Sequence, residues 1–265
     1  MISGLQADTV HGAETIDLQE GNSRGILLLH GFGDTPQTLR LLALELHSAG
    51  YDVRVPLLPG HGRSVAAFVA SRRQDWLDCA RAEMVTMKRS HSSVALVGLS
   101  MGGAIAAILA AENTDTAALV LLAPYLDMPV THKIASATFW LWAADKPRMS
   151  NSPGSIRDPE ERSKNLGYGV YTPRLLYELW RLASSARKAL AQIKSPTLVV
   201  QSRTDPRIKP EVAEMALRAL GKIEKKLIWI EGAGHIITVD YGREQVFHEV
   251  REWLDAHTLG KATTA

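Results

Sequence analysis

The chain has 265 residues, of which 46% are hydrophobic and 22% charged, a composition typical of a globular protein with a sizeable core. Its formal net charge of +2 is too small to indicate a nucleic-acid partner or an anionic membrane as a partner. The single cysteine, Cys79, cannot form an internal disulfide. The sequence shows no signal-peptide pattern and no run of 18 consecutive apolar residues. We therefore expect a cytoplasmic protein without stable membrane insertion.

The predicted elements alternate between short apolar strands and helices. Up to residue 122 they are a strand at 25–29, a helix at 36–49, a strand at 51–55, a helix at 75–89, a strand at 94–97, a helix after Ser100 and a strand at 117–122. After a long interval the alternation resumes with a strand at 197–201, a helix at 210–220, a strand at 225–230 and a helix at 242–256. Strands that are apolar on both faces predict a parallel sheet covered by helices, and the interval predicts an insertion into it.

The segment Gly98-Leu-Ser100-Met-Gly102 joins a predicted strand to a strongly helix-forming run. A serine between glycines in this context is typical of a nucleophile elbow, in which a tight turn exposes the hydroxyl above the sheet. The glycines lack side chains that would obstruct such a turn. A glycine-rich turn without chemistry is the alternative, and we favour Ser100 as the nucleophile.

A serine nucleophile needs a base, usually a histidine held by a carboxylate. Of the nine histidines, only His30 and His235 lie shortly beyond the end of a predicted strand, where functional loops of such sheets gather. The order serine, acid, histidine is expected for this elbow, so the acid is sought between Ser100 and His235. Asp205, four residues past the strand at 197–201, is the leading candidate, and Asp127 is the alternative.

The oxyanion of a serine hydrolase needs fixed hydrogen-bond donors. One is expected to be the backbone N–H of Met101, which follows the nucleophile. The other is assigned to the N–H of Phe32, in the glycine-rich loop after the strand at 25–29, with its side chain lining the acyl pocket. His30 and His61 also flank glycines, but no cysteine or carboxylate has a zinc-ligand spacing to them, so we expect them to brace loops and expect no metal site.

Five motifs occur in chain order, and together they resemble the α/β-hydrolase superfamily, within it the bacterial monoacylglycerol lipase and carboxylesterase group. They are Leu-Leu-Leu-His30-Gly-Phe-Gly-Asp-Thr-Pro, Leu-Pro-Gly60-His-Gly-Arg-Ser, Gly-Leu-Ser100-Met-Gly-Gly, Gln-Ser-Arg-Thr-Asp205-Pro and Gly-Ala-Gly-His235-Ile-Ile-Thr-Val-Asp240. The resemblance implies an eight-stranded or slightly smaller sheet, a Ser100–Asp205–His235 triad, an oxyanion hole from Phe32 and Met101, and no cofactor. It also implies a hydrolase core at 1–124 and 191–265 with a cap at 125–190.

The expected cap contains two apolar stretches, which predict packing on each other and on the sheet together with a substrate pocket; an acyl-chain tunnel whose rim makes transient lipid contact is the alternative. They are Ile134, Ala135, Phe139, Trp140 and Trp142, and then Tyr171, Leu175, Leu176, Leu179 and Trp180. Between them, residues 151–159 read as a mobile loop and a candidate gate.

The interpretation is a serine esterase that acts on medium-chain monoacylglycerols, with short, general carboxylic esters as the second substrate class. A carbon–carbon bond hydrolase and a non-catalytic ligand-binding protein on the same scaffold are less favoured interpretations. A small-molecule ester is thus the expected partner.

Overall fold

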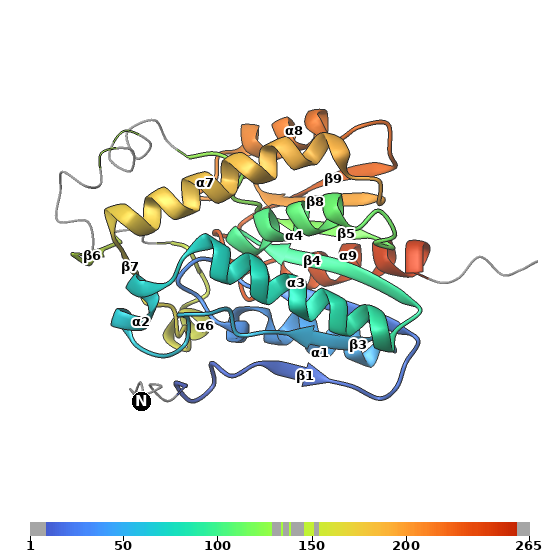
Figure 1. Ribbon diagram of the computed structural model, residues 1–265, viewed down its shortest axis with the longest axis horizontal. Coiled ribbons are helices and arrows are strands. Elements are labelled where there is room, and N and C mark those ends of the chain that lie inside the picture. Colours follow the sequence, from blue (N-terminus) through green and yellow to red (C-terminus); the bar gives the residue numbers. More distant parts are fainter. Residues whose placement is uncertain (1–8, 129–133, 135–137, 139–145, 151–153, 259–265) are drawn as a thin grey trace, which may run out of the picture.

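The computed structural model describes residues 9–128, 134, 138, 146–150 and 154–258, and a seven-stranded sheet lies at its centre (Figure 1). The strand order is β1-β3-β2-β4-β5-β8-β9. The strands are β1 (Ile16–Leu18), β2 (Arg24–Leu29), β3 (Asp52–Val55), β4 (Ser93–Leu99), β5 (Leu119–Leu122), β8 (Thr197–Ser202) and β9 (Lys225–Ile230). Only β1 is antiparallel to its neighbour, β3, while the other pairs are parallel. The predicted mostly parallel sheet is confirmed.

Helices cover both faces of the sheet, as Figure 1 shows. One face packs against α1 (Arg40–Ser48) and α9 (Arg243–Thr258), and the other against a larger group of helices. That group comprises α3 (Arg73–Ser90), α4 (Met101–Glu112), α7 (Pro173–Ala189) and α8 (Pro210–Ala219). The short helices are η1 (Pro36–Leu39), α2 (Val65–Ala70), α6 (Pro159–Ser163) and η3 (Leu190–Gln192).

Alternate residues of the central strands enter two separate hydrophobic clusters. In β2, Leu27 and Leu29 join the cluster beneath α3 and α4, whereas Ile26 and Leu28 join the cluster beneath α1 and α9. All four side chains are fully buried. Since successive strand side chains point to opposite faces, an unbroken apolar run is what a sheet covered on both sides requires.

Three features of the core differ from the sequence-based expectations. The edge strand β1 was not predicted, because it has only three residues and a polar Asp17 at its centre. The short helix α2 was missed as well, although Ser64 caps it by accepting a hydrogen bond from the N–H of Ala67. The expected helix at 36–49 begins as the 3-10 turn η1 before α1. Cys79 is half-buried against the core, and burial raises the pKa of its thiol.

The expected cap segment contains a helix that covers the sheet. The buried side chains of α7, among them Leu175, Leu182 and Ala186, belong to the same cluster as α3 and α4, and α7 packs directly on α4 (Figure 1). The described part of the same segment also contains α6 and the two-stranded sheet of β6 (Arg148–Met149) and β7 (Val170–Tyr171). Ile134 is exposed, whereas Ala135, Phe139, Trp140 and Trp142 lie outside the described residues.

Candidate active site

Ser100 sits in a strained turn between β4 and α4. Its backbone φ is 55° and ψ is −114°, in a region that residues with side chains rarely adopt. The turn is closed by glycines on both sides. A Cβ atom on Gly98 would lie 2.3 Å from the carbonyl oxygen of Gly102, and one on Gly102 would lie 2.0 Å from that of Leu29. The glycines at these two positions are therefore required by backbone contact, as the elbow motif predicted.

The structure brings Ser100, His235 and Asp205 into one hydrogen-bonded chain. The Oγ atom of Ser100 lies 2.9 Å from Nε2 of His235, and Nδ1 of His235 lies 2.7 Å from Oδ2 of Asp205. With the Nδ1–H donating to the carboxylate, Nε2 is left to accept the hydroxyl proton. The alternative acid, Asp127, instead lies 3.2 Å from Nη1 of Arg187, so the geometry selects Asp205 over Asp127.

Asp205 is held as a carboxylate by donors on three sides. Oδ1 accepts the backbone N–H groups of Arg207 at 2.7 Å and Ile208 at 3.0 Å, and Oδ2 accepts from Nε2 of Gln201 at 3.0 Å. Burial by itself raises the pKa of Asp205, but the charge of His235, its hydrogen bond and the backbone donors together lower it below the usual range. The group can therefore stabilise a positive charge on His235.

Asp240, the last residue of the motif that contains His235, fastens the loop that carries this histidine. Its fully buried carboxylate accepts backbone N–H groups from Gly234 at 2.7 Å and from Tyr241 at 2.8 Å. It also accepts those of Arg157 at 2.8 Å and Asp158 at 2.9 Å, from the segment that precedes α6. The sequence feature that could have indicated this role is an acidic residue directly after the buried segment Ile236-Ile-Thr-Val239.

The candidate gate at 151–159 is anchored in its described part. The carbonyl oxygen of Ser155 accepts the backbone N–H groups of His235 and Ile236, each at 2.9 Å. Together with the bonds to Asp240, these contacts tie residues 155–158 to the histidine loop, so this portion does not match the predicted mobile loop. Residues 151–153 lie outside the described residues.

The two residues expected to supply the oxyanion donors, Phe32 and Met101, lie next to Ser100 in the structure. Met101 is the first residue of α4, so its N–H has no partner within the helix. The N–H of Phe32 lies in the loop after β2, and within the described part of the chain no group accepts it. The Phe32 ring packs edge-on against Phe68 and Trp76, at centroid distances of 5.0 and 6.1 Å, and thereby lines the cavity beside Ser100.

His30 and His61 brace two loops, as expected. Nε2 of buried His30 accepts the N–H of Leu58 at 3.1 Å, and its Nδ1 lies 3.0 Å from the carbonyl oxygen of Gly31. His61 packs at 5.0 Å from His30, with Nδ1 3.1 Å from the carbonyl oxygen of Pro59. Burial lowers the pKa of His30 well below its usual value and that of His61 to about 4, so both rings are neutral. Among the described residues, no cluster of three or more histidine, cysteine or acidic side chains could hold a metal ion.

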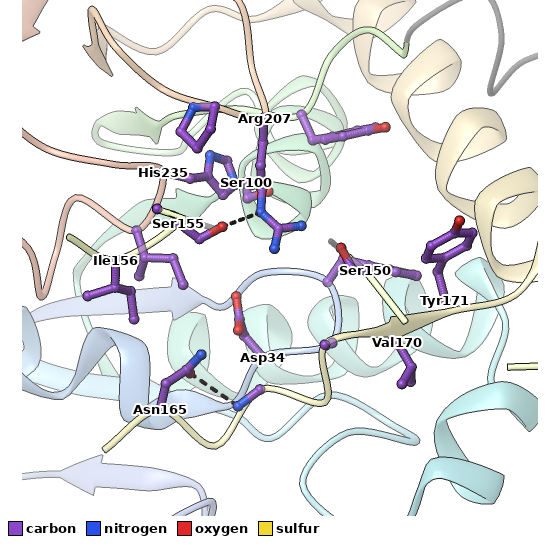
Figure 2. Close-up of a pocket in the computed structure, with 18 of the residues that line it drawn as sticks. Asp34, Ser100, Ser150, Ser155, Ile156, Asn165, Val170, Tyr171, Arg207 and His235 are labelled. Carbon is purple, nitrogen blue, oxygen red and sulfur yellow. Dashed lines mark hydrogen bonds between the residues drawn. The ribbon is translucent and has the colours of Figure 1, made fainter. Parts of the chain in front are cut away.

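A cavity of about 620 Å³ opens above Ser100 (Figure 2). Its apolar lining includes Phe32, Val170, Leu176 and Leu179, while Asp34, Ser155 and Arg207 contribute polar groups. A cavity of this size fits a small organic ligand. Ser100 and His235 both border it, so a bound carbonyl group would be within reach of the Ser100 hydroxyl. In the described part of the chain, no helix is long and apolar enough to cross a membrane.

Comparison with known proteins gives concordant matches over nearly the whole chain. The family model described as serine aminopeptidase, S33, matches residues 21–241. The thermostable monoacylglycerol lipase of Bacillus sp. (strain H-257) is 28% identical over 95% of this chain and 98% of its own length. The carboxylesterase of Bacillus subtilis (strain 168) is 28% identical over 89% of this chain and 94% of its own. A solved structure from a study of LipS and LipT, two metagenome-derived lipolytic enzymes, is 27% identical and covers 94% of this chain and 100% of its own, with a TM-score of 0.87.

Proposed function

The chain belongs to the serine aminopeptidase S33 family of α/β-hydrolases, and from that membership we propose that it is a serine esterase acting on medium-chain monoacylglycerols. The observation that carries the proposal is the hydrogen-bonded chain from Ser100 through His235 to Asp205 at the base of a partly apolar cavity. The two curated relatives are named for activity on esters, which favours an ester over a peptide as the substrate class.

In the proposed reaction, Oγ of Ser100 attacks the ester carbonyl carbon while Nε2 of His235 takes the hydroxyl proton. Asp205 stabilises the imidazolium that forms, and the N–H groups of Phe32 and Met101 bind the oxyanion. The carbon–oxygen bond to the alcohol then breaks, and His235 returns its proton to the leaving oxygen. Water, deprotonated by His235, attacks the acyl-enzyme and releases the acid, while Ser100 recovers its proton.

The acyl chain is proposed to lie along the apolar side of the cavity. Val170, Leu176 and Leu179 line this side, and they come from β7 and the first part of α7. Since α7 packs on the core, we propose that the cap comprises residues 125–172 and that its rim makes transient contact with lipid. A general carboxylesterase acting on short esters is the second candidate, favoured by the carboxylesterase relative.

Hydrolysis of a chain-length series by wild type and Ser100→Ala tests the proposal. The series pairs monoacylglycerols of increasing acyl length with aryl esters of the same acids. We expect an optimum at medium-length monoacylglycerols and a loss of at least about 10⁴-fold in kcat in Ser100→Ala, with an unchanged circular dichroism spectrum. Retained activity in the folded variant would refute Ser100 as the nucleophile. A preference for short aryl esters would instead support the general carboxylesterase.

A further inference from the structure

Two opposite charges face the cavity above Ser100 without pairing with each other. Figure 2 shows the carboxylate of Asp34 and the guanidinium of Arg207 pointing into the cavity from opposite sides. Their charged atoms are not within ion-pair distance, and no described hydrogen-bond donor contacts the Asp34 carboxylate. The reaction proposed above uses neither side chain.

Arg207 is anchored at one end only. Its backbone N–H donates to Asp205, and Nε of its side chain donates to Oγ of Ser155 at 2.6 Å. Within the described residues, the two terminal nitrogens of its guanidinium have no acceptor. The side chain is thus fixed in direction by Ser155, while the donors at its tip are aimed into the cavity beside Ser100 (Figure 2).

The carboxylate of Asp34 occupies space that two glycines leave open. A Cβ atom on Gly31 would lie 2.9 Å from its Oδ2, and one on Gly167 would lie 2.7 Å from its Oδ1. The Cβ position on Gly31 is also 3.5 Å from Cβ of Ser100, so the Asp34 carboxylate and the Ser100 side chain border the same small space. Burial raises the pKa of Asp34, and the charges of Arg207 and His235 oppose this rise.

Asp34 is half-buried and Arg207 is exposed at the mouth of the cavity, so the charged tips of both side chains are accessible to a bound ligand. A group bound between Asp34 and Arg207 would have to donate to the first and accept from the second. A hydroxylated group does both, whereas a phosphate would face repulsion from Asp34 and an ammonium group repulsion from Arg207. The pair therefore favours a neutral polyol.

We propose that Arg207 and Asp34 form the subsite for the alcohol half of the ester and recognise a vicinal diol such as that of a monoacylglycerol. One free hydroxyl accepts from the Arg207 guanidinium and the other donates to the Asp34 carboxylate. The apolar lining from Val170, Leu176 and Leu179 then receives the acyl chain. This inference rests on the proposed ester hydrolysis, and it names the residues that choose the leaving alcohol.

The test compares kcat/KM for 1-monooctanoylglycerol and methyl octanoate, which share an acyl group and differ in the diol. We expect wild type to prefer the glyceryl ester, and Arg207→Met to lower the glyceryl-to-methyl ratio about tenfold or more, mainly through a higher KM. Asp34→Asn should lower the same ratio, and Arg207→Lys should restore part of it. The substitutions at Arg207 leave its backbone bond to Asp205 in place.

Arg203→Met is the matched control, because Arg203 follows the same strand but pairs with Glu231 and lies over the Trp229 ring. It should keep the wild-type ratio. An unchanged ratio in both Arg207→Met and Asp34→Asn, with methyl octanoate still hydrolysed, would overturn the subsite and leave the esterase intact. If wild type prefers octanoyl lysophosphatidate and Arg207→Met removes that preference, the subsite recognises an anionic headgroup and the diol proposal is wrong. Hydrolysis of none of these esters by wild type would refute the esterase itself.

Discussion

The carboxylate of Asp240 fastens the loop that carries His235, and Asp240→Asn tests this role. The wild-type side chain accepts four backbone N–H groups, two from the loop around His235 and two from the segment before α6. Asparagine keeps one acceptor oxygen and replaces the other with an NH₂ group. Two of the four N–H donors then lose their acceptor and face another donor; the bond from Gly234 is buried and the other three are half-buried.

An unsatisfied buried donor costs about 1–3 kcal/mol and a half-buried one less, so we expect Asp240→Asn to lower the free energy of unfolding by about 3 kcal/mol. That is a large part of a typical total of about 5–15 kcal/mol, and it corresponds to a fall in Tm of about 10 °C. The activity should fall as well, because the same bonds position His235.

Urea denaturation at neutral pH measures the effect, and Asp127→Asn is the matched control. Asp127 pairs with Arg187 at the protein surface, where the same substitution should change the free energy of unfolding by less than about 1 kcal/mol. If Asp240→Asn unfolds within about 1 kcal/mol of wild type, the four hydrogen bonds do not hold the loop and the reasoning is wrong.

Three further predictions concern the elbow, the acid and the buried histidines. Gly102→Ala should abolish ester hydrolysis in a steady-state assay, because its Cβ would lie 2.0 Å from a backbone oxygen of Leu29; near-normal kcat would contradict this. Asp205→Asn should lower kcat about 10⁴-fold while Asp127→Asn leaves it unchanged, and equal losses would reject the assignment. The pKa of His61 is about 4 in the folded protein and about 6.5 in the unfolded chain, so between these pH values only the unfolded chain is protonated at His61. The free energy of unfolding should therefore fall by about 3 kcal/mol as the pH drops from 6.5 to 4. In urea titrations, His61→Phe should make this fall smaller.

Local patterns in the sequence were sufficient to predict the sheet and the tight turn from Gly98 to Gly102. An apolar run on both faces specifies a covered strand, and the glycines at 98 and 102 are needed where the backbone atoms of β2 and α4 approach. Asp205 and Asp127 both followed strand ends, so the sequence ranked them without excluding either. Only the three-dimensional position of His235 separates the two.

The features that the sequence did not reveal depend on contacts between distant segments. The N–H groups of Arg157 and Asp158 meet Asp240 more than 80 positions further along the chain, as the separations of 83 and 82 residues show. No local pattern in the 151–159 loop indicates that anchoring. The apolar face of α7 predicted packing on the sheet, but the contact with α4 was not specified, because an apolar helix face does not indicate which helix lies beside it.

Labelling with a fluorophosphonate probe, followed by peptide mass analysis, tests the nucleophile directly. We predict one adduct, on the peptide that contains Ser100, which is absent in Ser100→Ala and retained in Ser155→Ala. Ser155 also lines the cavity, but it lies outside the hydrogen-bonded chain to Asp205, so it serves as the internal control. A folded wild-type protein that forms no adduct, or that carries it on another serine, would contradict the proposed acyl-enzyme mechanism.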